Sequence, residues 1–133
     1  MRPDSFDFLK ALAEAPSPSG YEQPVQKIFR GYIKNAVDEI KTDVLGNSYG
    51  LIKGKGKPVV MLAGHCDEIG FMVSEITSNG FIKMLPLGGW WGHVALGQRV
   101  VVLSKKGPVL GVVGSTPPHI LEPEARKKVL EIT

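Results

Sequence analysis

The spacing of apolar residues changes near Val37 from a helical period to a strand-like one, and this change limits the chain to folds that join helices to a sheet. Before this point, apolar side chains recur at every third or fourth position; they are Val25, Ile28, Phe29, Tyr32 and Ile33. This spacing predicts an amphipathic helix, which Ser19 and Glu22 are expected to begin as a capping box. An earlier helix is predicted over 4–14, because Pro3 suits a helix start and one apolar stripe follows it, made of Phe6, Leu9, Leu12 and Ala13. The Pro- and Gly-rich residues 16–20 separate the two helices.

Strand-like runs follow the helices. Residues 37–44 and 49–53 are predicted to form two strands, and residues 58–63 a third. The third run, Pro-Val-Val-Met-Leu-Ala, is apolar throughout, and an apolar run of this length predicts a strand that is buried inside a sheet.

The pattern changes again beyond Gly70. Four short strand-like runs alternate with Gly-rich turns; they are 71–76, 81–85, 99–103 and 109–113. Short strands at this spacing are typical of a small β-sandwich or barrel, and a last helix is predicted over 122–132. We therefore predict an α/β fold class with two units, an α/β segment at 1–73 and a β-rich unit at 74–133.

Composition and charge fit a folded protein without nucleic-acid or membrane partners. The 133 residues are 43% hydrophobic and 22% charged, and the net charge of +3 is spread over short, separate basic groups. No stretch approaches the roughly 20 apolar residues that span a bilayer, and no signal-peptide core follows Met1. The single cysteine excludes an intramolecular disulfide and fits a reducing compartment. A cytoplasmic location is expected.

The run His65–Gly70 comes directly after the apolar residues 58–64. In an extended backbone alternate side chains point to the same face, so His65 and Asp67 are expected to lie together, with Cys66 on the opposite side. A histidine nitrogen can bind a divalent metal while a carboxylate fixes the orientation of the ring. The run thus offers one candidate metal ligand and one orienting group, although His65 also fits a purely structural role at the end of a strand.

Other residues admit both functional and structural interpretations. Cys66 is either a thiolate ligand or nucleophile or a small buried apolar group. The Gly-rich run 88–93 is either a ligand loop with aromatic walls or a tight turn whose Trp90 and Trp91 cover the edge of a core. His93 and His119 lack an identifiable partner in the sequence.

Several motifs resemble a known family when they are taken in order. They are Ser19-Gly20-Tyr21-Glu22, Thr42-Asp43 with Gly46-Asn47, Ala63 to Val73, Leu87-Gly88-Gly89-Trp90, Gly97-Gln98-Arg99-Val100, and Gly114 to His119. Together they resemble the N-terminal portion of the TET-type deblocking and glutamyl aminopeptidases, a family of metallopeptidases. The resemblance covers essentially the whole chain.

This resemblance implies a fold and a site. The fold is an α/β metallopeptidase domain interrupted by a β-rich dimerisation domain, which matches the change of pattern near Val73. His65 aligns with a ligand of one of two divalent metal ions, zinc or cobalt. Asp67 aligns with the catalytic acidic residue that orients this histidine. The bridging aspartate, the remaining ligands and the general base follow the β domain in the family, so the chain alone is predicted to be inactive.

The resemblance also implies partners. Family members remove N-terminal residues from peptides in the cytosol, and their dimers commonly assemble into tetrahedral dodecamers. Because this chain lacks the later strands of the α/β domain, the apolar run at 59–63 is expected to leave an edge or face uncovered and to promote association. Trp90 and Trp91 are expected to add to this association.

Two other functions remain open at this stage. The chain fits a non-catalytic interaction module with a vestigial His-x-Asp motif. A small basic nucleic-acid-binding barrel would require aromatic and basic residues interleaved along one strand face, and no such stripe is evident.

Overall fold

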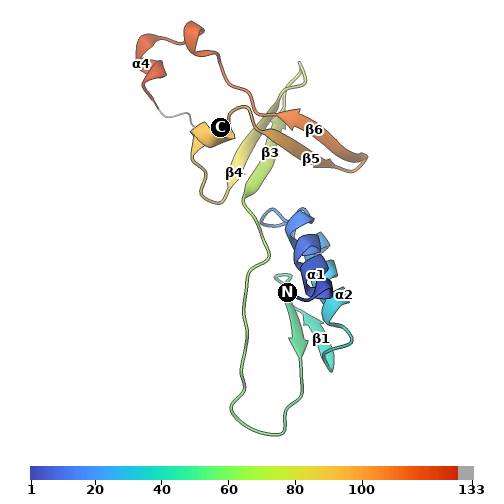
Figure 1. Ribbon diagram of the computed structural model, residues 1–133. Coiled ribbons are helices and arrows are strands. Elements are labelled where there is room, and N and C mark those ends of the chain that lie inside the picture. Colours follow the sequence, from blue (N-terminus) through green and yellow to red (C-terminus); the bar gives the residue numbers. More distant parts are fainter. Residues whose placement is uncertain (129–133) are drawn as a thin grey trace. The chain divides into compact units, whose positions relative to one another are not determined.

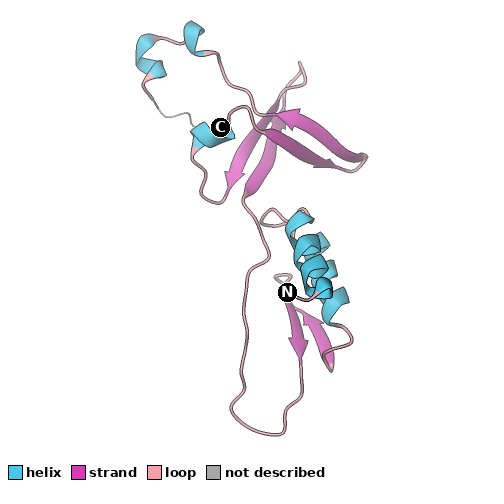
Figure 2. Ribbon diagram, in the orientation of Figure 1, coloured by secondary structure: helices cyan, strands magenta, loops and turns pink. Residues whose placement is uncertain are grey.

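The computed structural model describes residues 1–128 and divides the chain into two compact units, Met1–Gly70 and Phe71–Thr133. Both units combine helices with strands (Figures 1 and 2), which confirms the mixed α/β class. The division between the two units falls between Gly70 and Phe71. The assignment of one unit to a catalytic domain and of the other to a dimerisation domain stays a prediction.

The first unit begins with two packed helices, α1 (Pro3–Glu14) and α2 (Gln23–Ile33). The rings of Phe8 and Tyr32 stack with their centroids 3.8 Å apart, and Val25 is 2% exposed. Val25 and Tyr32 belong to the apolar stripe predicted for α2. Phe8 lies outside the stripe predicted for α1, so the ring contact of Phe8 with Tyr32 was not foreseen.

The capping box predicted for α2 is wrong. The N-cap residue is Glu22, which makes no side-chain cap hydrogen bond, and a proline stands in the first turn. Glu22 instead accepts a hydrogen bond from the backbone of Gly20 at 2.6 Å, and Ser19 is bonded to Asp67. Pro24 fixes the backbone at the helix start and has no N–H to be capped, which reduces the need for a capping side chain.

An antiparallel hairpin joins β1 (Glu39–Thr42) to β2 (Ser48–Leu51) in the first unit. Asp43 closes its turn by accepting hydrogen bonds from the backbone N–H groups of Leu45 and Asn47 and from the side chains of Asn47 and Tyr49. The Tyr49 hydroxyl, followed by the Asn47 amide, lowers the pKa of Asp43 from 3.8 to about 2, and Asp43 in turn raises the pKa of Tyr49.

We expect the hairpin turn to be lost in Asp43→Ala and to weaken in acid. Because the folded pKa of Asp43 lies below its ordinary value, the contribution is complete above pH 3.8 and disappears as the pH falls towards about 2. The Tyr49 hydrogen bond also stabilises the turn, but its pH dependence is opposite: because the pKa of Tyr49 is raised, the contribution is present below pH 10 and is lost as the pH rises further. Amide hydrogen exchange at Leu45 and Asn47 measures both effects, with Asp7→Ala on α1 as the control. Unchanged protection of these two amides in Asp43→Ala would contradict the assignment.

The strand predicted at 58–63 is not formed. Residues 52–67 belong to no helix or strand (Figure 2), and the side chains of Val59 to Leu62 are 75–95% exposed. A buried strand requires paired neighbours and a covering layer, and the described residues supply neither of them here. The run is therefore an uncovered apolar segment. This agrees with the expectation that residues 59–63 leave an apolar face uncovered.

The second unit consists of two hairpins and short helical turns. Its elements are β3 (Gly70–Ile76), β4 (Ile82–Leu87), α3 (Gly92–Ala95), β5 (Arg99–Ser104), β6 (Gly107–Val112), a 3-10 turn (Pro118–Ile120) and α4 (Pro123–Arg126). The strands pair as β3 with β4 and β5 with β6, and the described residues form two separate hairpins instead of one closed barrel. Within residues 1–128 each strand pairs only with its neighbour in sequence, so the closed sandwich or barrel predicted from the strand pattern is not formed there.

The C-terminal helix is shorter than predicted within the described residues. It spans Pro123–Arg126, and the predicted part from 129 to 132 lies outside the residues that the structure describes. Among residues 1–128, none of the helices has the length and apolar character needed to cross a membrane.

Candidate functional site

The loop between α1 and α2 holds the His65–Gly70 run in place. Pro18 and Glu68 form a parallel bridge, in which the Glu68 N–H donates to the Ser17 carbonyl at 2.9 Å. The Glu68 carboxylate in turn accepts the Ser17 N–H at 2.9 Å. Gly70 is required here because a Cβ atom at this position would lie 2.8 Å from the Pro18 side chain. The contacts of Ser17 and Pro18 with Glu68 and Gly70 thus fix the run through this loop.

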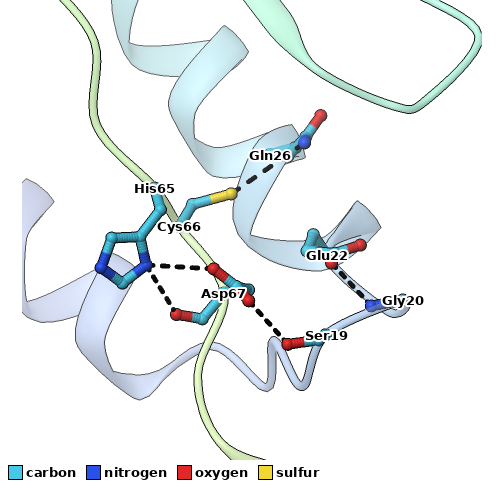
Figure 3. A network of polar contacts seen from close by, with 7 residues as sticks. All are labelled: Ser19, Gly20, Glu22, Gln26, His65, Cys66 and Asp67. Atoms are coloured by element: carbon cyan, nitrogen blue, oxygen red, sulfur yellow. Dashed lines mark hydrogen bonds and ion pairs between the residues drawn. The ribbon is translucent and has the colours of Figure 1, made fainter. Parts of the chain in front are cut away.

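His65 and Asp67 lie together, as the alternation of side chains predicted. The His65 Nδ1 atom is 3.0 Å from Asp67 Oδ1 and 3.2 Å from the Asp67 carbonyl oxygen (Figure 3). The His65 side chain is 87% exposed and that of Asp67 is 40% exposed. With Nδ1 directed at the carboxylate, the exposed Nε2 atom is the nitrogen available to a metal ion.

Asp67 is held on both of its oxygens. The Ser19 hydroxyl donates to Oδ2 at 2.6 Å, while Oδ1 faces the His65 ring. The Ser19 bond and, after it, the His65 bond lower the pKa of the Asp67 carboxyl below its ordinary value. Asp67 is therefore a carboxylate at neutral pH, which favours a proton on Nδ1 of His65 and a free lone pair on Nε2.

Cys66 points away from His65, towards α2 (Figure 3). Its thiol is exposed, so the interpretation as a small buried apolar group is wrong. The amide nitrogen of Gln26 lies 4.0 Å from the sulfur. Gln26 is itself held by Ser48 at 2.7 Å and by Arg30 at 3.2 Å.

A cavity of about 280 Å³ lies in the first unit beside His65. Leu9, Leu12, Ala13 and Val25 form an apolar wall, and the other wall is Ser17 together with 65–68. The apolar stripe of the first helix was visible in the sequence. Its position against the His65 run was not, because helical periodicity defines a face without naming what lies opposite.

The remaining histidines belong to aromatic and turn contacts. The His93 ring meets the Trp91 ring edge-on with centroids 5.3 Å apart, and Phe71 stacks on Trp90 at 4.5 Å. The His119 carbonyl accepts a hydrogen bond from Arg126 at 3.4 Å. Within residues 1–128, no three His, Cys, Asp or Glu side chains are grouped closely enough to hold a metal ion.

The sequence profile of the family described as M42 glutamyl aminopeptidase matches residues 46–133. The chain belongs to this family. The M42 chain is 40% identical over 123 residues to a glutamyl aminopeptidase of Lactococcus lactis, with 87% of the chain and 34% of that protein covered. The curated relatives that it matches first are covered over about a third of their length.

Solved structures agree with this assignment. A TET aminopeptidase from a marine sediment Thaumarchaeota archaeon has a TM-score of 0.93 and 45% identity, with 98% of the M42 chain and 37% of that chain covered. The TET1 peptidase of Pyrococcus horikoshii, which can assemble into a tetrahedron or a large octahedral shell, has a TM-score of 0.77 and 33% identity, with 95% and 37% covered. The fold of the M42 chain therefore resembles the N-terminal part of TET peptidase structures.

Sequence reasoning on the M42 chain missed the role of Ser19. Its position three residues before Glu22 indicated a helix cap, whereas its hydroxyl bonds Asp67, 48 positions further along the chain. The only signal was its place in the first family motif, Ser19-Gly20-Tyr21-Glu22, which was used for the resemblance and not for the site.

Proposed function

We propose that this chain forms the N-terminal part of a metal-dependent aminopeptidase in which His65 binds one of two divalent ions, zinc or cobalt, and Asp67 orients it. The observation that carries the proposal is the contact of 3.0 Å between His65 Nδ1 and Asp67 Oδ1 beside an exposed ring. The Ser19 hydroxyl also holds Asp67, and the chain belongs to a family of aminopeptidases, and together these support the ligand role over the non-catalytic module.

The donor set fits a metal ion in part. A neutral imidazole whose Nδ1–H is bonded to a carboxylate is a common protein ligand for zinc, but a zinc site takes three or four ligands. We infer that the others come from parts of the full-length protein outside the third that this chain matches. When bound, divalent ions in such sites polarise the scissile carbonyl and lower the pKa of a water molecule. The chain's own contribution is to place Nε2 of His65 and to keep the proton on His65 Nδ1, where it is hydrogen-bonded to the Asp67 carboxylate.

Substrate, location and assembly belong to the same proposal. The relatives are named as aminopeptidases, which supports peptides as substrates at their N-terminal residue. The Pyrococcus horikoshii TET1 peptidase can assemble into a tetrahedron or a large octahedral shell, and the solved structure of PhTET1-12s is a dodecamer. Both support self-association of the full-length protein, which we propose to proceed from dimers to a tetrahedral dodecamer. A cytoplasmic location fits the composition of the chain.

A chimera tests the proposal. This chain replaces the matching segment of the Lactococcus lactis glutamyl aminopeptidase, and hydrolysis of glutamyl-p-nitroanilide is measured with added zinc or cobalt. We expect a folded, metal-dependent enzyme, because the chain supplies the His65 ligand and its carboxylate. A chimera that folds and assembles but shows no hydrolysis would favour the interaction module instead.

We expect the 133-residue chain alone to show no aminopeptidase activity and only weak binding of divalent metal. One imidazole with an outer carboxylate does not hold zinc as three or four ligands do, and residues 1–128 contain no larger group of donors. Hydrolysis of the same substrate by the pure chain, together with calorimetric titration with zinc, measures both. Hydrolysis that disappears in His65→Ala would contradict this expectation.

A further inference from the structure

The Ser19 hydroxyl donates a hydrogen bond to Asp67 within the polar network around His65 (Figure 3). The hydroxyl oxygen lies 2.6 Å from Oδ2, which is the range of a hydrogen bond from a hydroxyl to an ionised carboxylate. It joins two segments that are 48 positions apart in the sequence. Asp67 Oδ1 is left to face His65.

The backbone around Ser19 is fixed independently of this hydroxyl. The Ser19 N–H donates to the Glu68 carbonyl at 3.3 Å, and the Tyr21 N–H donates to the Pro18 carbonyl at 2.8 Å. Gly20 adopts a φ of +91°, which favours glycine, and its N–H is bound by Glu22 at 2.6 Å. These bonds do not involve the Ser19 side chain, so the loop should stay docked when the hydroxyl is removed.

Because Asp67 and His65 are exposed to water, the Ser19 hydroxyl matters for the position of the Asp67 carboxylate. Asp67 is 40% exposed and His65 is 87% exposed, so water competes for both partners of the contact at 3.0 Å. A carboxylate held at one oxygen only can rotate about its side-chain bonds and exchange His65 for water. A carboxylate bonded at both oxygens has far fewer accessible orientations, and ordering it beforehand lowers the entropic cost of holding the ring.

We propose that Ser19 is a positioning residue that acts through Asp67: its hydroxyl fixes the carboxylate so that Asp67 selects the Nδ1–H tautomer of His65 and directs Nε2 outward. The importance of this for catalysis rests on the proposed function, in which Nε2 binds a metal ion. The hydrogen-bond relay itself is a property of this chain without metal. Threonine carries the same hydroxyl and should replace serine, whereas alanine should not.

The test reads the tautomer directly. The full chain is labelled with ¹⁵N-histidine, and the three histidines are distinguished with a His65→Gln variant. The ¹⁵N shifts of Nδ1 and Nε2 are recorded without metal at a pH where the ring is neutral. We expect the Nδ1–H form of His65 to predominate and its ratio to the Nε2–H form to fall on the order of fivefold in Ser19→Ala, the effect of one ordinary hydrogen bond. Ser19→Thr should keep the wild-type ratio.

Matched controls separate positioning from general loss of structure. Ser48→Ala removes a hydroxyl of the same unit that bonds Gln26 and Arg30, and it should leave the His65 ratio unchanged. Amide protection of Glu68 shows whether the loop remains docked in each variant. A docked Ser19→Ala chain with the wild-type tautomer ratio would overturn the proposal. Because no metal is used, this result is independent of whether the chimera is an active enzyme.

Discussion

The chimera that carries His65→Ala is expected to lose its aminopeptidase activity almost completely. Removal of the imidazole takes away the only metal ligand that we assign to this chain, and a metal ion with an incomplete ligand set neither stays bound nor activates water efficiently. The expected loss in kcat/KM exceeds the roughly 10- to 100-fold cost of losing an orienting carboxylate. Measuring kcat/KM for glutamyl-p-nitroanilide over a range of zinc and cobalt concentrations gives this loss.

Asp67→Asn and His93→Ala serve as graded comparisons in the same chimera. Asp67→Asn keeps His65 but weakens its orientation, and it should lower metal affinity roughly 10- to 100-fold, with partial recovery at high metal concentration. His93 contacts Trp91 in the other unit, and His93→Ala should retain activity. If His65→Ala were as active as the unmodified chimera, His65 would not be a ligand, although the family assignment would stand.

The parts of the structure that depend on local geometry were predictable from the sequence. The contact between His65 and Asp67 follows from the alternation of side chains in an extended backbone, and this alternation holds whether or not the segment pairs with a strand. The first two helices followed equally well from their apolar stripes and, for α1, from Pro3 at its start. These features need no knowledge of the rest of the fold.

The predictions that failed concern contacts with residues that are distant in the sequence. Burial of 58–63 requires a covering layer that the described residues do not provide, and its apolar composition could not show this. Ser19 satisfied the local rule for a helix cap, yet its hydroxyl makes a charge-assisted bond to Asp67, which is stronger than a cap bond to an amide. A local motif therefore identified the right residue and assigned it the wrong partner.

The chain alone is expected to form dimers or larger species at micromolar concentration. Val59, Val60, Met61 and Leu62 are contiguous and 75–95% exposed, and their backbone pairs with no strand of the described residues. Such a segment can pair with a second copy of the chain by edge contact and bury its side chains there. Sedimentation equilibrium of the pure chain measures the association constant.

The double variant Val60→Lys/Leu62→Lys tests whether this segment drives the association. Burial of one such aliphatic side chain contributes about 1.5–3 kcal/mol, so its replacement by a charge should weaken association by at least about tenfold. Val44→Lys/Leu45→Lys adds the same charge at the exposed tip of the β1–β2 hairpin and should have a much smaller effect. A single monomeric species with a cooperative unfolding transition would instead show that the chain closes its own core in solution. In that case the exposed run would be covered by this chain itself, and the fold would not depend on additional strands from a longer protein.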